Sequence, residues 1–180
     1  QGSANADVWV KGTAAAPEVT VKVWSEKISA MKETIESPTV MLALKGEKIT
    51  ISNAAAKWRG AAIAASGSVE GSEKVNITAT LENIQPGAVA PFYPDIAKLK
   101  IKGAVTAKAV ITGKPAAPKI DLTLSSGSLA LLDSVSFKNL KVATSLAGDP
   151  KALEKADIDL DISAASAAAE GIGLSDLALK

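Results

Sequence analysis

The stretch KLKIKGAVTAKAVITG, residues 98–113, decides the fold class of this chain, because apolar and polar residues alternate along its whole length. Leu99, Ile101, Val105 and Ile111 share one parity, and lysines and threonines occupy most of the other. Successive side chains of a β-strand point to opposite faces, so a period of two predicts one strand with one apolar face. At about 3.3 Å per residue, such a strand reaches about 50 Å.

The same alternation recurs through most of the chain, as in Val19, Val21 and Val23 or in Ile120, Leu122 and Leu124. Short alternating runs separated by glycine-rich and proline-rich turns are typical of antiparallel sheets. One helical turn is expected where Asp149 caps Pro150 and the residues up to Lys155. The sequence therefore predicts an all-β protein with an elongated antiparallel or mixed sheet.

A proline-rich segment interrupts the alternation near the middle of the chain. Pro86, Pro91 and Pro94 lie in residues 85–96, and proline cannot donate to a sheet ladder. We expect a first β-unit over residues 1–84, a connection over 85–96, and a second, truncated β-unit over 97–180 within one continuous sheet.

The second unit resembles the first. The run from Gly12 to Pro17 is matched 101 residues later by the run from Gly113 to Pro118, and each is followed by three alternate aliphatic residues. The segment at Ile51 is matched 111 residues later at Ile162, with the same spacing of alanines. These matches predict weak repeats of about 100 residues, as in arrays whose neighbouring units extend one sheet.

The composition excludes several classes of function. Twenty basic residues face 19 acidic ones, the only arginine is Arg59, and aromatic residues make up 3% of the chain, so there is no basic, aromatic surface for nucleic acid. The absence of cysteine and histidine excludes disulfides, the usual zinc sites and catalysis by imidazole or thiolate. No nucleophile with a base is recognisable, so we expect no enzyme and no cofactor.

The aspartates at 157, 159 and 161 superficially resemble a calcium loop. The sixth position of that loop requires glycine, and here it is Ile162. On a strand these three carboxylates would share the solvent-facing side, so we expect no metal site.

The apolar face is the feature that requires an explanation, because a one-sided sheet must cover its apolar side. One solution is a β-sandwich or β-solenoid whose inner faces meet in a closed core. The other is a folded-over sheet with an open apolar groove. Hydrophobic residues make up 47% of the chain and are mostly small aliphatics, so the walls of such a groove would leave room inside.

Three motifs resemble the AsmA-like family, which includes TamB. The first runs from Leu99 through Gly103 to Gly113 and continues with Pro118 and the alternating residues 120–124. The second is the step Phe137-Lys138-Asn139-Leu140, and the third is its echo Leu81-Glu82-Asn83-Ile84. The resemblance is best between residues 81 and 148.

The resemblance implies a fragment of a bridge-like lipid-transfer protein of the bacterial envelope. Members are implied to be anchored in the inner membrane and to span the periplasm as a taco-like β-sheet whose apolar groove carries phospholipid toward the outer membrane. The implied partners are a phospholipid or another acyl-chain ligand and, through regions outside this fragment, an outer-membrane barrel of the Omp85 type.

On this hypothesis the groove is lined by the large aliphatic residues of the second unit, namely Leu99, Ile101, Val105, Ile111, Ile120, Leu122, Leu124, Val142, Leu146, Ile158, Leu160 and Ile162. The same residues fit an ordinary closed core, so a structural β-solenoid stalk or adhesin segment is the alternative.

Overall fold

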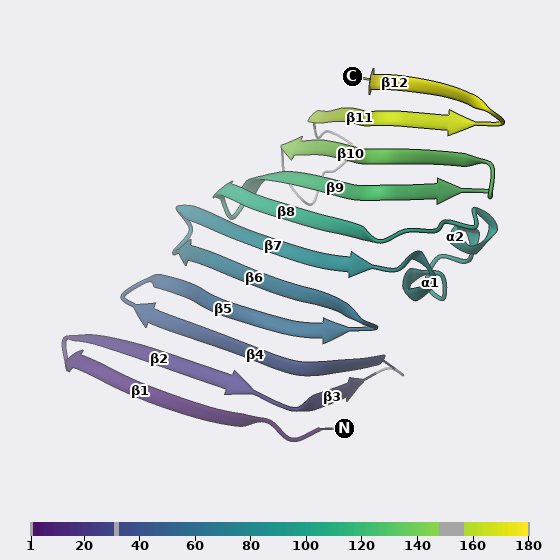
Figure 1. Ribbon diagram of the computed structural model, residues 1–180. Coiled ribbons are helices and arrows are strands. Elements are labelled where there is room, and N and C mark those ends of the chain that lie inside the picture. The colour runs from purple at the N-terminus through teal and green to yellow at the C-terminus, as the bar shows by residue number, and fades with distance from the viewer. Residues whose placement is uncertain (1, 31–32, 148–156, 180) are drawn as a thin grey trace.

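The structure, a computed structural model, describes residues 2–30, 33–147 and 157–179, which form one antiparallel sheet of twelve strands (Figure 1). The helical turn expected at residues 149–155 lies outside the described residues. The strands are β1 (Asn5–Thr13), β2 (Ala16–Trp24), β3 (Lys27–Ala30), β4 (Glu33–Lys45), β5 (Lys48–Trp58), β6 (Ala61–Glu70), β7 (Lys74–Ile84), β8 (Val105–Lys114), β9 (Ala117–Leu131), β10 (Val135–Ala147), β11 (Asp157–Ala169) and β12 (Ile172–Leu179).

The order of the strands in the sheet follows the order of the chain. Each strand pairs with the next one, except that β2 and β3 both pair with β4, and the sheet ends at β1 and β12. The sheet is therefore open and does not close into a barrel. The all-β prediction is confirmed, and every described strand pair is antiparallel, so the sheet is not mixed.

The two short helices α1 (Pro86–Val89) and α2 (Pro94–Lys98) lie between β7 and β8. They occupy the proline-rich connection, and a proline stands at the first turn of each, where its missing N–H costs no hydrogen bond. Because β7 pairs directly with β8, the sheet continues across this connection. The division into two β-units stays a prediction.

The predicted long strand over residues 98–113 is wrong for its first seven residues. Helix α2 ends at Lys98, and strand β8 begins only at Val105. Between them the backbone turns at Lys100 (φ 45°) and Gly103 (φ 111°), with one isolated bridge from Lys102 to Ala130. A Cβ at Gly103 would collide with the Ser128 carbonyl oxygen, so this close approach requires glycine. Alternation alone does not reveal such a turn.

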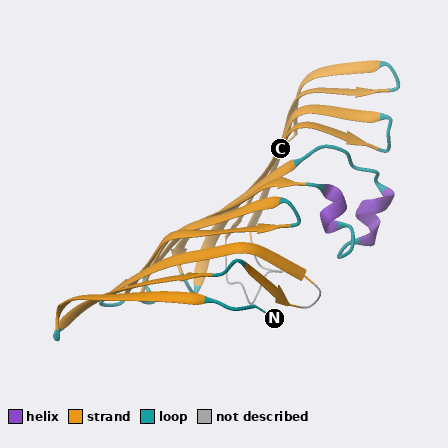
Figure 2. Cartoon of the chain, turned by 60° about the horizontal axis from the view of Figure 1, so that its bottom comes forward, coloured by secondary structure: helices purple, strands orange, loops and turns teal. Residues whose placement is uncertain are grey.

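Several strands contain one residue with a left-handed backbone, and these residues lie on a common line across the sheet. They are Ser37 in β4 (φ 47°), Asn83 in β7 (φ 60°), Asn139 in β10 (φ 50°) and Asp176 in β12 (φ 52°). We call this line the crease. Figure 2 shows strands bending out of a common plane. A left-handed residue reverses the alternation of side chains, so the next apolar residue on the same face comes three positions later instead of two. This explains the spacing from Leu81 to Ile84 and from Phe137 to Leu140.

No second layer of protein covers the sheet within the described residues. The only buried hydrophobic residues there are Ala61, Val75, Leu129 and Ala164, and no large side chain is fully buried. No helix among the described residues is long and apolar enough to cross a membrane. The structure thus leaves one face of the sheet without a protein core.

Candidate functional site: the apolar face

The pairing register assembles aliphatic residues from ten strands into one row. Residues directly opposite each other in an antiparallel sheet share a face, so the row can be followed from pair to pair. Its members are all aliphatic except one glycine, and they are Val8, Val21, Leu42, Ile51, Gly67, Ile77, Ile111, Ile120, Leu146 and Ile158. At about 4.8 Å between strands, this row is about 43 Å long.

Three further rows of the same kind lie beside it, and together the four rows define the apolar face. On one side lies the row Val10, Val19, Leu44, Ile49, Val69, Val75, Gly113 and Pro118. On the other side lies the row Ala6, Val23, Val40, Ala54, Ala65, Ala79, Ala109, Leu122, Thr144 and Leu160. The last row is Ala56, Ile63, Leu81, Ala107, Leu124, Val142, Ile162 and Leu179.

The opposite face of the sheet is largely polar, although it also carries Trp9, Met41 and Val110. Along each strand, residues of this face alternate with residues of the apolar rows. One row of paired residues on this face consists of Thr20, Ala43, Thr50, Ser68, Asn76, Thr112 and Lys119. An ion pair joins neighbouring strands on this face, between Glu18 of β2 and Lys45 of β4, and a second ion pair lies within β9, between Lys119 and Asp121. The Lys119 ammonium and the Ser145 hydroxyl hold the pKa of Asp121 below its usual value.

The large residues of the apolar face are most exposed in the strands near the two edges of the sheet and mostly half-buried between them. The exposed fraction of its large residues reaches 67% at Val10, 65% at Ile158 and 64% at Leu179. A fully buried Val, Leu or Ile side chain contributes about 1.5–3 kcal/mol, so a face of this size leaves a large hydrophobic free energy unused. Exposed apolar patches that exceed those of ordinary monomers mark binding surfaces.

The centre of the apolar face is lined by four alanines that lie directly opposite one another, Ala54, Ala65, Ala79 and Ala109 of β5–β8. Larger side chains flank them, with Ile51, Ile77 and Ile111 in the neighbouring row and Ile63 and Leu81 on the other side. We call these four residues the alanine row. Gly67, Ala56 and Ala107 also lie in the two flanking rows, so small side chains predominate at the centre of the apolar face.

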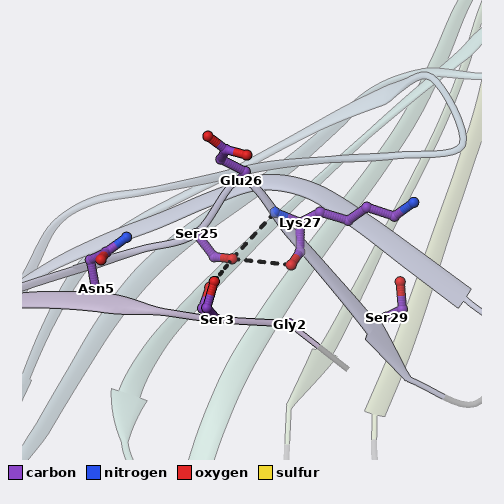
Figure 3. A pocket seen from close by; sticks show the side chains of 7 residues that line it. All are labelled: Gly2, Ser3, Asn5, Ser25, Glu26, Lys27 and Ser29. Carbon is purple, nitrogen blue, oxygen red and sulfur yellow. Dashed lines mark hydrogen bonds between the residues drawn. The ribbon is translucent and has the colours of Figure 1, made fainter.

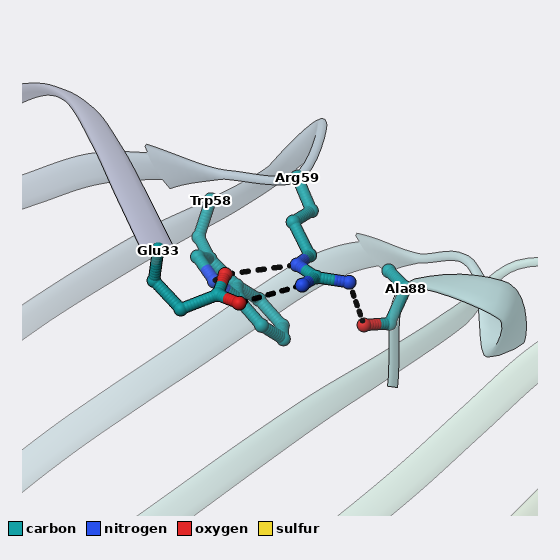
Figure 4. A network of polar contacts seen from close by, with 4 residues as sticks. All are labelled: Glu33, Trp58, Arg59 and Ala88. Carbon is teal, nitrogen blue, oxygen red and sulfur yellow. Dashed lines mark hydrogen bonds and ion pairs between the residues drawn. The ribbon is translucent and has the colours of Figure 1, made fainter. Parts of the chain in front are cut away.

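One end of the apolar face is fastened by Arg59, in the turn between β5 and β6 (Figure 4). Its guanidinium donates to both carboxylate oxygens of Glu33, at 2.6 and 2.9 Å, and to the Ala88 carbonyl oxygen of α1 at 2.9 Å. It also lies 5.6 Å from the ring centroid of Trp58 and 5.3 Å from that of Phe92. Arginine thereby ties the connection between β7 and β8 to strands β4 and β5.

The same network explains a pKa shift. The Arg59 guanidinium and then the Trp58 indole, which donates to Glu33 at 2.9 Å, lower the pKa of the Glu33 carboxyl. Opposite Trp58 lies Ala61, which is 1% exposed and is the most buried of the core residues. The face is therefore best packed where the connection rests against it.

The other side of the connection is fastened to the turn between β9 and β10. Lys102 and Lys100 both pair with Asp133, with Nζ to carboxylate distances of 2.5 and 3.4 Å, and they lower the pKa of that carboxyl. The Leu132 amide donates to the Leu99 carbonyl oxygen at 2.9 Å. Residues 85–104 thus form an insert that bridges the ends of several strands at one edge of the face.

Two buried serines stabilise equivalent bends in the two halves of the sheet. The Ser25 hydroxyl bonds the carbonyl oxygens of Ser3, at 2.6 Å, and Lys27, at 3.1 Å (Figure 3). The Ser126 hydroxyl bonds those of Ala104, at 2.8 Å, and Ser128, at 3.0 Å. Each serine and each of its two partners are separated by 101 residues from their counterparts.

Nine of the twelve residues predicted to line a groove lie in the four rows of the apolar face, and the tenth, Val105, is on the same side two residues before Ala107 in β8. They come from β8, β9, β10 and β11, and the register places them in rows with one another. Leu99 and Ile101 do not, because they precede β8 and belong to no strand. The carboxylates of Asp159 and Asp161 lie on the polar face, opposite Ser145 and Ala143, and no group of metal-ligating side chains occurs in the described part of the chain.

The first unit also contributes to this face, although only residues of the second unit were predicted to line it. Val8, Leu42, Ile51 and Ile77 lie in the same row as Ile111 and Ile158. Their alternation carried the signal, since it has the same period as that of the second unit. The Arg59 network left no recognisable signal, because its members come from three separate segments, namely β4, the end of β5 with the turn after it, and the connection between β7 and β8.

Comparison with known proteins gives no further assignment. The chain matches no protein-family model, no curated protein and no solved structure.

Proposed function

We propose that the apolar face binds the acyl chains of phospholipids and conducts them along the sheet between the inner and outer membranes. The observation that carries this proposal is the set of aliphatic rows that cross the sheet without a second protein layer over them. Each acyl methylene transferred from water to such a face contributes about 0.8 kcal/mol. A row of about 43 Å exceeds the hydrocarbon core of a bilayer, about 30 Å, so lipids could follow one another along it.

The proposal requires the sheet to enclose its apolar face as a taco-like groove. The crease supports this, because left-handed residues in β4, β7, β10 and β12 bend the strands along one line and reverse the alternation so that aliphatic side chains stay on one face. The alanine row gives a place where an acyl chain can lie between larger side chains. Polar head groups would remain at the open mouth.

The proposal also requires continuation of the face over a long distance, which repeats provide. The matched serine contacts support repeats of about 100 residues, as do the paired hairpins in which Gly12 (φ 92°) lies opposite Pro17 and Gly113 (φ 96°) lies opposite Pro118. The resemblance to the AsmA-like family carries the remaining parts of the proposal. These are an anchor in the inner membrane, a location in the periplasm, and an outer-membrane barrel of the Omp85 type as a partner of the longer protein.

Lipid content of the purified chain tests the proposal. The chain is expressed with export to the periplasm, purified without detergent, extracted with organic solvent and analysed by mass spectrometry against a co-expressed soluble control protein. We expect phospholipid in the extract at a fixed molar ratio to the chain. No phospholipid above that of the control protein would contradict the proposal and favour a stalk or adhesin segment.

A matched pair of variants assigns the lipid to the apolar face. Leu122 and Thr123 are neighbours in β9 that lie on opposite faces. Leu122→Arg places a charge in the middle of the apolar face and should lower the bound phospholipid several-fold, whereas Thr123→Arg should leave it unchanged. Equal lipid content in two variants with native circular dichroism would refute binding at this face.

A further inference from the structure

Strand β1 is a free edge of the sheet. It pairs only with β2, every one of its residues is exposed, and its register runs from Asn5 to Thr13 without a bulge or a proline. Alternate N–H and C=O groups on the outer side of β1 therefore lack a partner strand. Natural sheets usually block such an edge with prolines, bulges or a covering segment.

The counterpart of β1 in the second half of the sheet is β8. Equivalent contacts around the two strands are made by residues 101 positions apart in the sequence. A Cβ at Gly2 would collide with the carbonyl oxygen of Lys27. In the same way, a Cβ at Gly103 would collide with the carbonyl oxygen of Ser128. The hydrogen bonds of the Ser25 and Ser126 hydroxyls also join residues that are 101 positions apart from their counterparts. The register repeats as well, since Val8 lies opposite Val21 and Ala109 lies opposite Leu122.

The two strands differ on their outer sides. The outer edge of β8 pairs with β7, where Ile77 lies opposite Ile111, Ala79 opposite Ala109 and Leu81 opposite Ala107. No strand among the described residues pairs with the outer edge of β1. The pairing of β7 with β8 thus shows what kind of strand this type of edge accepts.

We infer that the outer edge of β1 is a docking site for a further antiparallel strand with the chemistry of β7, in which aliphatic and polar residues alternate. Shifting the β7–β8 register by 101 residues defines the pairing. The residue equivalent to Ile77 lies opposite Val10, that equivalent to Ala79 opposite Val8, and that equivalent to Leu81 opposite Ala6. The docked strand would extend by one position the three rows of the apolar face that reach β1.

The opposite edge of the sheet is a poorer template. In β12 the left-handed residue Asp176 interrupts the pairing with β11, so that Ser175 and Leu177 pair but Asp176 does not. An irregular edge strand resists the addition of another strand. The inference therefore applies to β1. It rests on the matched contacts of the two halves and is independent of lipid binding.

Disulfide trapping with a peptide tests both the docking and its register. The peptide has the sequence of residues 74–84 with cysteine in place of Ala79, and the chain contains no cysteine of its own, so each cross-link can be assigned. Cysteines at directly opposed positions of an antiparallel pair lie within disulfide distance. The Val8→Cys chain should form a disulfide with this peptide under mild oxidation. Trp9→Cys, its neighbour on the polar face, should form several-fold less.

Two controls make the result decisive. Ala6→Cys should cross-link to a second peptide, which has cysteine in place of Leu81. This second pair tests the same register independently, in case Val8→Cys alters the folding of the chain. A peptide in which each aliphatic residue is exchanged with its polar neighbour should cross-link to neither variant. Absence of cross-linking for both matched pairs, or equal cross-linking by the exchanged peptide, would overturn the inference. Disulfide-linked dimers of Val8→Cys in place of the peptide adduct would overturn it too, because they would show that β1 pairs with a second copy.

Discussion

The two faces of this sheet are built from the same strands, yet they differ in almost every physical property. Neighbouring residues such as Leu122 and Thr123 lie on opposite sides, and the register extends this difference from strand to strand. The polar face carries ion pairs such as Glu18–Lys45, whereas the apolar face carries rows of aliphatic side chains, most of which remain at least partly exposed. A sheet can therefore place most of its aliphatic side chains on one face and still lack a core in the described residues.

The apolar face is not equally open everywhere. Next to the insert, Ala61 is 1% exposed, whereas Val10 on the edge strand β1 is 67% exposed. The free energy of unfolding should therefore depend most on two features. One is the left-handed residues of the crease, which keep the aliphatic side chains on one face, and the other is the set of contacts that hold the insert, residues 85–104, against the sheet. Binding should depend most on the centre of the apolar face, which is half-buried and which no second layer covers in the described residues.

The largest effect on folding is expected at the crease. Asn139 has φ 50°, and a β-branched residue there would be strained, so Asn139→Val should lower the free energy of unfolding by about 1–2 kcal/mol. Asn139→Gly should be nearly neutral, because glycine adopts this conformation freely. Urea unfolding measures both variants. Asn76→Val in the extended strand β7 is the control, and equal destabilisation by the two valine variants would contradict this role of the crease.

The next effect concerns the shape of the apolar face rather than its polarity. Ala79→Phe keeps the face apolar but fills the alanine row, so we expect about a two-fold loss of bound phospholipid by mass spectrometry. Thr78→Phe, on the polar face, is the matched control. If Ala79→Phe binds as much lipid as the unmodified chain, acyl chains do not lie in the alanine row.

A smaller effect is expected where the insert is fastened. Arg59→Gln removes the charged hydrogen bonds to Glu33 and the contact with the Phe92 ring, so the thermal midpoint should fall by a few degrees. Lys57→Gln removes a nearby positive charge without this network and should not change the midpoint. Increased hydrogen exchange of residues 85–104 in Arg59→Gln would show that the insert is released, and unchanged exchange would argue against this role.

The smallest effect is a dependence of stability on pH. The pKa values of Glu18, Glu33, Asp121 and Asp133 are all lowered in the folded chain by basic and hydrogen-bonding partners. Their stabilisation is complete above the pKa of an unfolded carboxyl, about 4, and is lost as the pH falls through the lowered values. The thermal midpoint should therefore decline below about pH 4, and Glu33→Gln should make the decline shallower. A midpoint that rises on acidification would contradict this assignment.

Much of the fold could be predicted from the sequence because period-two alternation is a local property. Runs such as 19–23 and 120–124 are strands whose aliphatic side chains share one face, and the proline-rich segment is a connection without strands. Ten of the twelve predicted groove residues lie on that face for the same reason. The stretch 98–104 failed, because Lys100 and Gly103 turn the chain within a pattern that still alternates.

The sequence by itself determined which side chains would share a face, since alternation and turns act over a few residues. Only the tertiary structure decided that the strands pair in chain order, that the crease preserves one face across the bends, and that no second layer covers that face in the described residues. These properties depend on contacts between residues far apart in the chain, and an alternating strand has the same sequence pattern whether its apolar side meets protein, lipid or water.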